Sequence, residues 1–318
     1  MRPPAWWAQD SLRARLLAPV SAAVTAAAAR RATVAGWRAP VPVLCCGNAV
    51  VGGAGKTTLA LDLAARLSAR GVAVHILTRG YGGQVRGPLR VDLARHDAAL
   101  VGDEPLLLAA AAPTWVCADR AAGARVALAE GATALLMDDG LQNPTLAKTA
   151  SFLVIDGTVG FGNGRVLPAG PLREPVRAAA RRCAAAVLIG ADESGALTAL
   201  PAGLPVLRAS LAADAPLHGR RVLAFAGIAR PAKFHATLRA AGAELAATMD
   251  FPDHHRFTAP ELDAVLARAA ALGADPVTTP KDAVRLPPCI RSRVQTVGVR
   301  LVWEAGPSLD RLLRELVP

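Results

Sequence analysis

Short apolar runs alternate with helix-like segments along the first two thirds of the chain. Val41–Cys46 has the continuous apolar character of a buried strand, and a glycine-rich turn and a helix from Lys56 to about Ala69 follow it. A further helix is predicted after Pro105. The remaining elements predicted in this part are strands at Val72–Thr78, Thr114–Ala118, Ala134–Met137, Phe152–Ile155 and Ala185–Ile189, and a helix at Arg120–Glu130. This alternation predicts a mainly parallel sheet with helices on both faces.

The pattern restarts near Arg220 and predicts a second, smaller α/β lobe. The predicted elements are strands at Val222–Ala226, Glu244–Met249, Pro276–Thr279 and Val294–Val302, and helices at Pro231–Ala241 and Pro260–Leu272. We therefore expect an N-terminal helical segment (1–40), a core (41–191), a Gly/Ala/Pro-rich linker (192–216) and a second lobe (217–318), whose last helix packs back on the core. Ligands commonly bind in a cleft between two such lobes.

Composition adds a preference for anionic partners. The 318 residues carry a formal net charge of +11, and a strongly basic protein attracts nucleic acid, acidic lipid or phosphorylated small molecules. None of the five cysteines form a Cys-x-x-Cys pair. This pattern indicates buried thiols in a reducing compartment.

The N-terminal segment combines tryptophans with arginines, a composition that suits a membrane interface. Its longest uncharged stretch, Leu16–Ala29, contains Pro19 and is shorter than the roughly 20 residues that span a bilayer. Asp10 falls between Trp6 and Leu17 on a helical wheel, so the apolar face is interrupted. A packed helix and a membrane-surface helix both fit this segment.

The glycine-rich turn after the first strand has the features of a phosphate-binding loop. Glycines let backbone N–H groups approach phosphate oxygens, and the start of the next helix adds partial positive charge. Lys56 is placed to reach the β- and γ-phosphates, and the Thr57 hydroxyl to bind Mg²⁺. Val50 occupies a position where the common pattern has glycine. The predicted nucleotide-binding residues of this loop are Val50, Val51, Gly52, Gly53, Ala54, Gly55, Lys56, Thr57 and Thr58.

Two aspartates, Asp138 and Asp139, follow the apolar run Ala134–Met137. In P-loop proteins a buried strand that ends in aspartate holds Mg²⁺ directly or through water. Many strands end in aspartate, so the upstream loop gives this pattern its meaning. The sequence therefore predicts a nucleoside triphosphate and Mg²⁺ as ligands, with Thr57, Asp138 and Asp139 at the metal.

Acidic and histidine side chains stand in two further loops. Asp103 and Glu104 precede Pro105 at a probable helix start, where they either cap the helix or supply a general base for an attacking hydroxyl. In the second lobe, Asp253 and His254 form either a polar surface loop or a tuned imidazole. The residues alone leave both alternatives open.

Two other segments carry candidate ligand-binding side chains. Arg173 lies in the rigid segment Pro168–Glu174, where it is either solvated or clamps a phosphate with two hydrogen bonds. Arg79 and Tyr81 lie in the turn Thr78–Gly83 at the end of the second strand, and Tyr81 is the one tyrosine of the chain.

In this order, these motifs resemble the tetraacyldisaccharide 4′-kinase family of lipid A biosynthesis. The resemblance extends from Pro42 to Asp282 and rests on a set of segments rather than on any single one. The segments are Gly-Asn before the loop, Gly-Gly-x-Gly-Lys-Thr, Arg-Gly-Tyr-Gly, Gly-Asp-Glu-Pro, Asp-Asp-Gly-x-Gln, Pro-Ala-Gly-Pro-Leu-Arg-Glu and Phe-Pro-Asp-His-His.

The resemblance implies a P-loop-type fold and transfer of the γ-phosphate of ATP to the 4′-hydroxyl of a tetraacylated disaccharide 1-phosphate, giving lipid IV-A. It implies a peripheral enzyme on the cytoplasmic face of the inner membrane, and we expect a monomer. Asp103 matches the family's catalytic base, Asp138 and Asp139 its metal and catalytic carboxylates, and His254 a histidine from the second lobe. The matches around phosphates or substrate are Lys56, Arg173, Arg79, Tyr81, Glu104 and Gln142.

The chain departs from the family at Asn143, where many members have histidine. We place Asn143 near the substrate without a proton-transfer role, because an amide still donates and accepts hydrogen bonds.

Two other classes of protein remain as alternatives. A P-loop ATPase switch that binds a cargo at the membrane shares the loop, but the chain has neither a second lysine early in the loop nor a Cys/His cluster. A nucleic-acid-binding protein would fit the charge, but no helix-turn-helix, RNA-binding aromatic motif or zinc pattern is visible. We rank both below the kinase.

Overall fold

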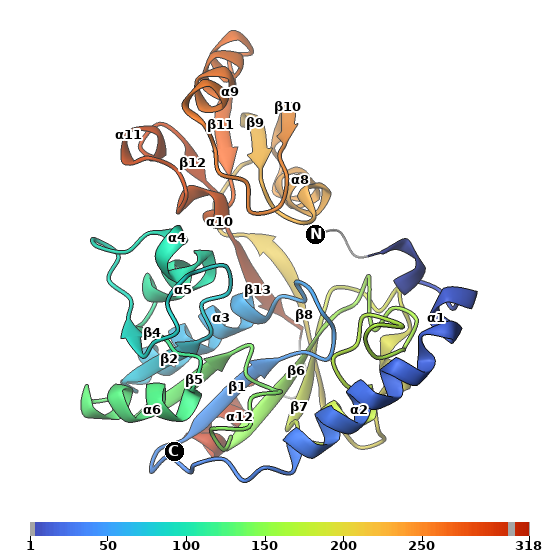
Figure 1. Cartoon of the computed structure of the whole chain (residues 1–318). Coiled ribbons are helices and arrows are strands. Elements are labelled where there is room, and N and C mark those ends of the chain that lie inside the picture. The colour runs from blue at the N-terminus through green and yellow to red at the C-terminus, as the bar shows by residue number, and fades with distance from the viewer. Residues whose placement is uncertain (1–3, 305–308, 318) are drawn as a thin grey trace.

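The computed structural model describes residues 4–304 and 309–317 of the chain. Within them, nine strands form one sheet (Figure 1). Its order is β13 (Val299–Trp303), β8 (Val206–Ala213), β7 (Ala185–Ile189), β6 (Ala150–Asp156), β1 (Val43–Gly47), β5 (Ala134–Asp138), β2 (Val74–Thr78), β4 (Thr114–Val116) and β3 (Leu89–Arg90). The strands from β8 to β4 pair in parallel, and the edge strands β13 and β3 are antiparallel to their neighbours. The predicted mainly parallel sheet is confirmed.

Helices cover both faces of this sheet. One face packs against α3 (Lys56–Ala69), α5 (Asp103–Ala109) and α12 (Leu309–Leu316), and the other against α2 (Ala18–Ala32), α6 (Arg120–Ala129) and α7 (Val176–Ala180). The central strands β1, β5 and β6 are buried along their whole length. Strands covered on both faces have this continuous apolar pattern.

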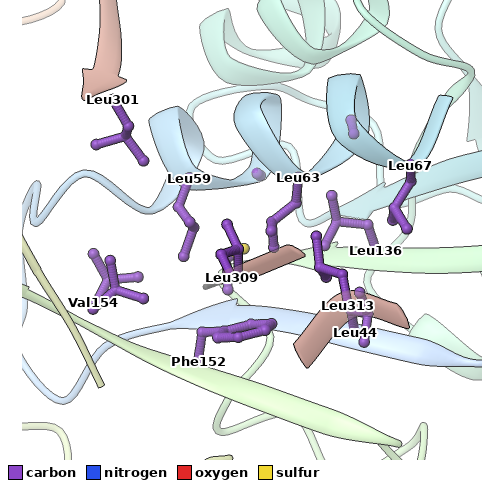
Figure 2. Close-up of a cluster of buried hydrophobic side chains, with 14 of the residues drawn as sticks. Leu44, Leu59, Leu63, Leu67, Leu136, Phe152, Val154, Leu301, Leu309 and Leu313 are labelled. Carbon is purple, nitrogen blue, oxygen red and sulfur yellow. The ribbon is translucent and has the colours of Figure 1, made fainter. Parts of the chain in front are cut away.

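The last helix returns to the core after the chain has left the second lobe. Leu309 and Leu313 of α12 pack beside Leu63 of α3 in the largest apolar cluster (Figure 2). Arg66 of α3 also forms an ion pair with Asp310 at 2.7 Å. The C-terminal helix is thereby part of the core layer.

The second lobe is a smaller α/β unit. Its parallel sheet has the order β10 (Glu244–Asp250), β9 (Arg221–Ala226), β11 (Asp275–Thr278) and β12 (Gln295–Thr296). The helices of this lobe are α8 (Pro231–Ala240), α9 (Ala259–Ala271), α10 (Pro280–Ala283) and α11 (Pro288–Arg291). Thr258 and Glu261 form a reciprocal cap at the start of α9, which satisfies two backbone donors at that helix end.

Two segments differ from the sequence-based prediction. The expected linker 192–216 contains a short 3₁₀ helix, η2 (Ala196–Ala199), and strand β8, which extends the core sheet beside β7. The expected strand Val294–Val302 is divided at Gly298 into β12 of the second lobe and β13 of the core. Both differences have the same cause. Pairing with strands that are distant in the sequence decides which sheet a strand joins, and the local apolar pattern does not show which strands will pair.

The N-terminal segment lies along the core rather than across the lobes. It contains η1 (Ala5–Trp7), α1 (Leu12–Leu16) and α2, and the Ser21 hydroxyl of α2 donates to the Val166 carbonyl at 2.8 Å. Among residues 4–304 and 309–317, every helix is too short or too polar to cross a bilayer. One short helix, α4 (Ala98–Val101), directly precedes α5 and lies beside it (Figure 1).

The carboxyl ends of the parallel core strands share one edge of the sheet, and the second lobe lies beyond that edge (Figure 1). The loops after β1, β2, β5 and β6 therefore meet there. Those loops carry most of the residues that the sequence singled out.

Candidate active site

The phosphate-binding loop connects β1 to α3. Gly55 has φ +93°, a left-handed backbone conformation that favours glycine. The Lys56 side chain is buried, and its Nζ donates to the Gly52 carbonyl at 3.3 Å. Burial lowers the pKa of Lys56, and nearby Asp139 partly offsets this effect. A largely dehydrated cation thus stands at the centre of the loop.

A second segment supports this loop from the side. The Val51 N–H donates to the Pro171 carbonyl at 2.8 Å, and the Arg173 N–H donates to the Ala49 carbonyl at 2.7 Å. Val50 also forms an antiparallel bridge with Leu172. This bridge gives valine a structural role at the position where the common loop pattern has glycine, and it brings Arg173 to the loop.

Strand β5 ends beside the loop at Asp138. The Thr57 hydroxyl donates to the Oδ2 atom of Asp138 at 3.1 Å. Burial raises the pKa of Asp138 to about 7, and the neighbouring carboxylate of Asp139 adds to the shift. Its Oδ1 atom is buried with no hydrogen-bond partner. A buried carboxylate with one unpartnered oxygen costs free energy unless a ligand contacts it.

Asp139 faces the cations rather than Thr57. Arg173 binds its two oxygens at 2.7 and 3.0 Å, and the Nζ of Lys56 lies 3.7 Å away. Burial alone would raise the pKa of Asp139, but Lys56 and Arg173 outweigh burial and lower it. Gln142 accepts from Arg173 at 3.3 Å and donates to the Asn48 carbonyl at 2.9 Å. Asp139 also has φ +53°, an unusual backbone for a non-glycine residue.

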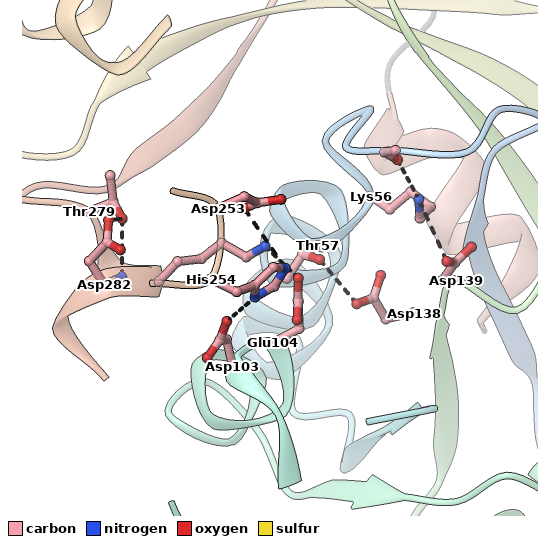
Figure 3. Close-up of polar contacts among 12 residues, drawn as sticks. Lys56, Thr57, Asp103, Glu104, Asp138, Asp139, Asp253, His254, Thr279 and Asp282 are labelled. Atoms are coloured by element: carbon pink, nitrogen blue, oxygen red, sulfur yellow. Dashed lines mark hydrogen bonds and ion pairs between the residues drawn. The ribbon is translucent and has the colours of Figure 1, made fainter. Parts of the chain in front are cut away.

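Asp103 of α5 meets His254 of the second lobe. The Nδ1 atom of His254 lies 2.7 Å from the Oδ2 atom of Asp103, and Figure 3 shows the imidazole reaching across to that carboxylate. The hydrogen bond to Asp103 raises the pKa of His254, although burial opposes the shift. Burial alone would raise the pKa of Asp103, but hydrogen bonds from His254 and Arg285 lower it to about 2. Two segments far apart in the sequence thereby form one proton-handling pair.

A second pair of contacts joins the lobes beside the loop. Asp156, at the end of β6, accepts from Lys233 at 2.8 Å and from Arg230 at 2.9 Å. Arg230 also donates to the Gly53 carbonyl in the phosphate-binding loop at 2.5 Å. The sequence analysis missed these residues, although Asp156 shares with Asp138 the pattern of a buried strand that ends in aspartate.

Arg285 and Lys281, which follow β11, were also missed. Arg285 binds both oxygens of Asp103, with Nε at 2.9 Å from Oδ1, and Lys281 pairs with Glu104. Asp103 and Arg285 are 182 residues apart. No local pattern in the sequence could connect residues at that separation.

The expected substrate residues divide into two groups. Tyr81 is 76% exposed with its ring centroid 6.4 Å from that of His254, and the Oε2 atom of Glu104 is buried without a partner. Both therefore border the Asp103–His254 pair. Arg79 is exposed beside them. Asn143 instead uses its Oδ1 to accept from the Thr145 N–H and hydroxyl, which orders its own turn.

The expected cleft between the lobes is spanned by side chains in this structure. Two cavities lie elsewhere, one of about 270 Å³ in the second lobe near Arg293, and one of about 250 Å³ between the end of α2 and Lys148. The candidate site is therefore described by the side chains that meet at the interface between the lobes.

Comparisons with known proteins agree with this geometry. The model of the family described as tetraacyldisaccharide-1-P 4′-kinase matches residues 13–317. The chain belongs to this family. Two relatives named tetraacyldisaccharide 4′-kinase, from Gluconacetobacter diazotrophicus and Rhodospirillum centenum, are 61% and 55% identical to it. The alignments cover 98% and 100% of this chain and 97% of each relative.

A solved structure of the same family has a similar fold. The “apo” form of LpxK from Aquifex aeolicus, solved in complex with ATP, aligns with a TM-score of 0.77 and 27% sequence identity, over 97% of this chain and all of the other. The resemblance inferred from the motifs is confirmed. The chain is a lipid kinase of the tetraacyldisaccharide 4′-kinase family and acts in lipid A biosynthesis.

Proposed function

We propose that the interface between the two lobes transfers the γ-phosphate of ATP to the 4′-hydroxyl of tetraacyldisaccharide 1-phosphate, giving lipid IV-A. A bond forms between the 4′-oxygen and the γ-phosphorus as the bond from that phosphorus to the ADP oxygen breaks. The observation that carries the proposal is the Asp103–His254 pair, which lies at the same sheet edge as Lys56, Asp138 and Asp139 (Figure 3). Phosphoryl transfer needs this combination of positioned charge and a proton acceptor.

We assign the nucleotide phosphates to the loop 50–58. Backbone N–H groups of the loop and the Lys56 ammonium face the phosphates, and the start of α3 adds its partial charge. Arg173 exchanges its bidentate contact with Asp139 for a phosphate, two oxygens of which can accept the same pair of parallel hydrogen bonds. The solved Aquifex relative in complex with ATP supports this assignment.

The residues present fit Mg²⁺. Within the described residues, no group of three or more His, Cys, Asp or Glu side chains is arranged for a metal. Mg²⁺ is usually held by one or two carboxylates together with substrate phosphates and water, so such a group is not required. The unpartnered Oδ1 atom of Asp138 and the adjacent Thr57 hydroxyl supply that donor set, with Asp139 nearby. When bound, the ion would neutralise charge on the β- and γ-phosphates.

Asp138→Asn tests the metal assignment. We expect the Mg²⁺ concentration for half-maximal activity to rise about tenfold or more, because the amide loses the charge that holds the ion. Mn²⁺ binding in the presence of ATP, followed by electron paramagnetic resonance, should weaken in parallel. Asp119→Asn, which retains the cap of α6, is the matched control. An unchanged Mg²⁺ requirement in Asp138→Asn would remove Asp138 from the metal site.

We assign the acceptor proton to the Asp103–His254 pair. Asp103 is ionised at neutral pH, and its hydrogen bond orients His254. The pair takes the proton of the 4′-hydroxyl as the oxygen attacks, a step worth about 10²–10⁴ in rate. Tyr81 and Glu104 border the pair and would contact the sugar. Closure of the lobes excludes water and limits hydrolysis of ATP.

An acceptor that lacks the 4′-hydroxyl tests whether this hydroxyl receives the γ-phosphate. With a 4′-deoxy analogue we expect no phosphorylated lipid and no rise in phosphate release above that of ATP alone. A cargo-regulated ATPase would instead release phosphate in proportion to analogue bound. That second outcome would contradict the kinase mechanism.

We further propose that α1 and the start of α2 dock the enzyme, as a monomer, on the cytoplasmic face of the inner membrane. Leu12 and Leu16 of α1 are 74% and 72% exposed and lie four residues apart, so they form an outward apolar stripe. Val20 at the start of α2 is 52% exposed and adds to the exposed apolar surface. Asp10, which interrupts the helical wheel, forms exposed ion pairs with Arg15 and Arg165. An apolar stripe beside arginines suits an anionic membrane surface.

The double substitution of Leu12 and Leu16 by aspartate tests this docking. We expect at least tenfold weaker binding to anionic liposomes, measured by co-sedimentation, because burial of each leucine contributes about 1.5–3 kcal/mol. Leu93→Asp, which places an aspartate at another exposed leucine, outside the N-terminal segment, is expected to leave binding unchanged. Equal binding of the double variant and the wild type would contradict membrane docking by this stripe.

A further inference from the structure

Arg285 contacts the proposed catalytic carboxylate from the second lobe. Its Nε lies 2.9 Å from the Oδ1 atom of Asp103, and its Nη2 binds Oδ2. Both side chains are only 7% exposed. A planar guanidinium that meets both oxygens of a carboxylate fixes its orientation as well as its charge. Arg285 thus restricts how Asp103 can face His254.

The second lobe holds Arg285 in this position. The Nη1 atom donates to the Oδ1 atom of Asp282 at 3.1 Å and to the Gly227 carbonyl at 3.2 Å, leaving Nε and Nη2 for Asp103. Asp282 is completely buried and also accepts from the Gly227 N–H at 3.1 Å and the Thr279 hydroxyl at 2.6 Å. The guanidinium is therefore held by contacts that lie within the second lobe.

The same backbone group also places His254. The Gly227 carbonyl accepts from the His254 N–H at 3.0 Å, so one peptide group contacts both partners of Asp103. A Cβ at Gly227 would lie 3.0 Å from Asp282 and 3.1 Å from the His255 Cβ. This close packing fixes Arg285 and His254 relative to each other, and His254 keeps a left-handed backbone with φ +57°.

We propose that Arg285 is a positioning residue that orients Asp103 across the lobe interface, so that the proton-accepting pair is complete only when the lobes are together. The proposal rests on the proposed function, because it acts through the Asp103–His254 pair. It goes beyond that function by adding a residue of the second lobe that acts through Asp103. Arg285 couples lobe docking to base formation, since Asp103 belongs to the core and both of its partners to the second lobe.

The charges around the pair set the expected pH dependence. Asp103 faces Arg285 and His254, while His254 also faces Asp253 and Lys281, and Arg285 also faces Asp282 and Asp253. The Nη2 atom of Arg285 lies 3.4 Å from the Nδ1 atom of His254. A cation in this place opposes protonation of the pair. Its removal should therefore raise the apparent pKa of the pair, and the acidic limb of kcat/KM should move to higher pH.

The test compares pH profiles of Arg285→Gln, Arg285→Lys and the wild type. For Arg285→Gln we expect the acidic limb to move up by about one pH unit and kcat at the optimum to fall about 10- to 100-fold, because Asp103 loses its fixed orientation. Arg285→Lys retains the charge but not the two parallel hydrogen bonds. It should therefore lower kcat while leaving the limb within about 0.3 pH units of wild type. If the glutamine variant does not fold, equal kcat of Arg285→Lys and wild type overturns the proposal.

Lys233→Ala is the matched control. It removes one of the two cations that pair with Asp156 across the lobe interface, and it does not touch Asp103. Weaker contact between the lobes can therefore lower kcat/KM in this variant. The acidic limb of its kcat/KM profile should nevertheless stay at the same pH as in the wild type. The same limb in Arg285→Gln and wild type, or an equal shift in Lys233→Ala, would overturn the proposal. Failure of the proposed function is distinguishable, since the wild type would then form no phosphorylated lipid at any pH.

Discussion

Replacing Asp103 by asparagine is expected to lower kcat by about 10²–10⁴-fold, the usual contribution of a general base. The amide keeps the size of the side chain, and its one oxygen, placed where Oδ2 lies in Asp103, can still accept from Arg285 Nη2 and His254. Its NH2 group then replaces the oxygen that accepts from Arg285 Nε. The amide cannot take up the proton of the acceptor, nor does it stabilise a protonated His254. We expect the KM for ATP to change little, because Asp103 lies away from Lys56 and the phosphate-binding loop. Steady-state kinetics with ATP and lipid acceptor measure both quantities.

Asp97→Asn is a suitable comparison for this variant. Asp97 is a nearby carboxylate that caps α4 by accepting from the Leu100 N–H at 2.8 Å, and asparagine caps equally well. Its kcat should therefore match the wild type. Thermal unfolding of both variants separates loss of the fold from loss of the base. A folded Asp103→Asn enzyme with near-wild-type kcat would remove Asp103 from proton transfer.

Lys56→Met is expected to lower kcat/KM by about 10²–10³-fold, the cost of losing one preorganised electrostatic contact with the transition state. The same change should alter the unfolding temperature by no more than about 4 °C. Burial of the Lys56 ammonium costs free energy of desolvation, which is also why its pKa is lowered. In Lys56→Met, Asp139 keeps its bidentate partner Arg173. Methionine fills the same space without that cost. Loss of function without loss of stability is the expected signature of a side chain retained for its ligand.

Arg70→Met provides the corresponding control at the other end of α3. It removes a cation that hydrogen-bonds the Val317 carbonyl, far from the sheet edge where the loop lies. We expect near-wild-type kinetics and a modest loss of stability. If Lys56→Met and Arg70→Met both retained the kcat/KM of the wild type, the loop would not be the phosphate site.

Local sequence patterns predicted the core with small errors at element ends. The helix from Lys56 to Ala69 and the strand Ala185–Ile189 have the predicted bounds, because glycine before the lysine and a continuous apolar run determine them locally. The loop and the two aspartates after β5 lie together because the carboxyl ends of parallel strands share one edge. The shared edge of parallel strands can be predicted without knowing the structure of the loops that follow those strands.

Long-range partnership accounts for what the sequence could not predict. Strand β8 and strand β13 belong to the core sheet through their pairing with each other and with β7. The roles of Arg285 and Asp156 depend on how the second lobe sits on the core. Ion pairs between residues more than 70 positions apart leave no periodic signal, so only the three-dimensional arrangement connects them.

Incubation with γ-labelled ATP and tetraacyldisaccharide 1-phosphate, followed by analysis of the lipid, tests the central claim most directly. The account predicts that the wild type places label on the 4′-oxygen of the disaccharide in a 1:1 ratio to the ADP formed, and that Asp103→Asn places almost none. Release of label as inorganic phosphate, or label at any other position of the lipid, would contradict it.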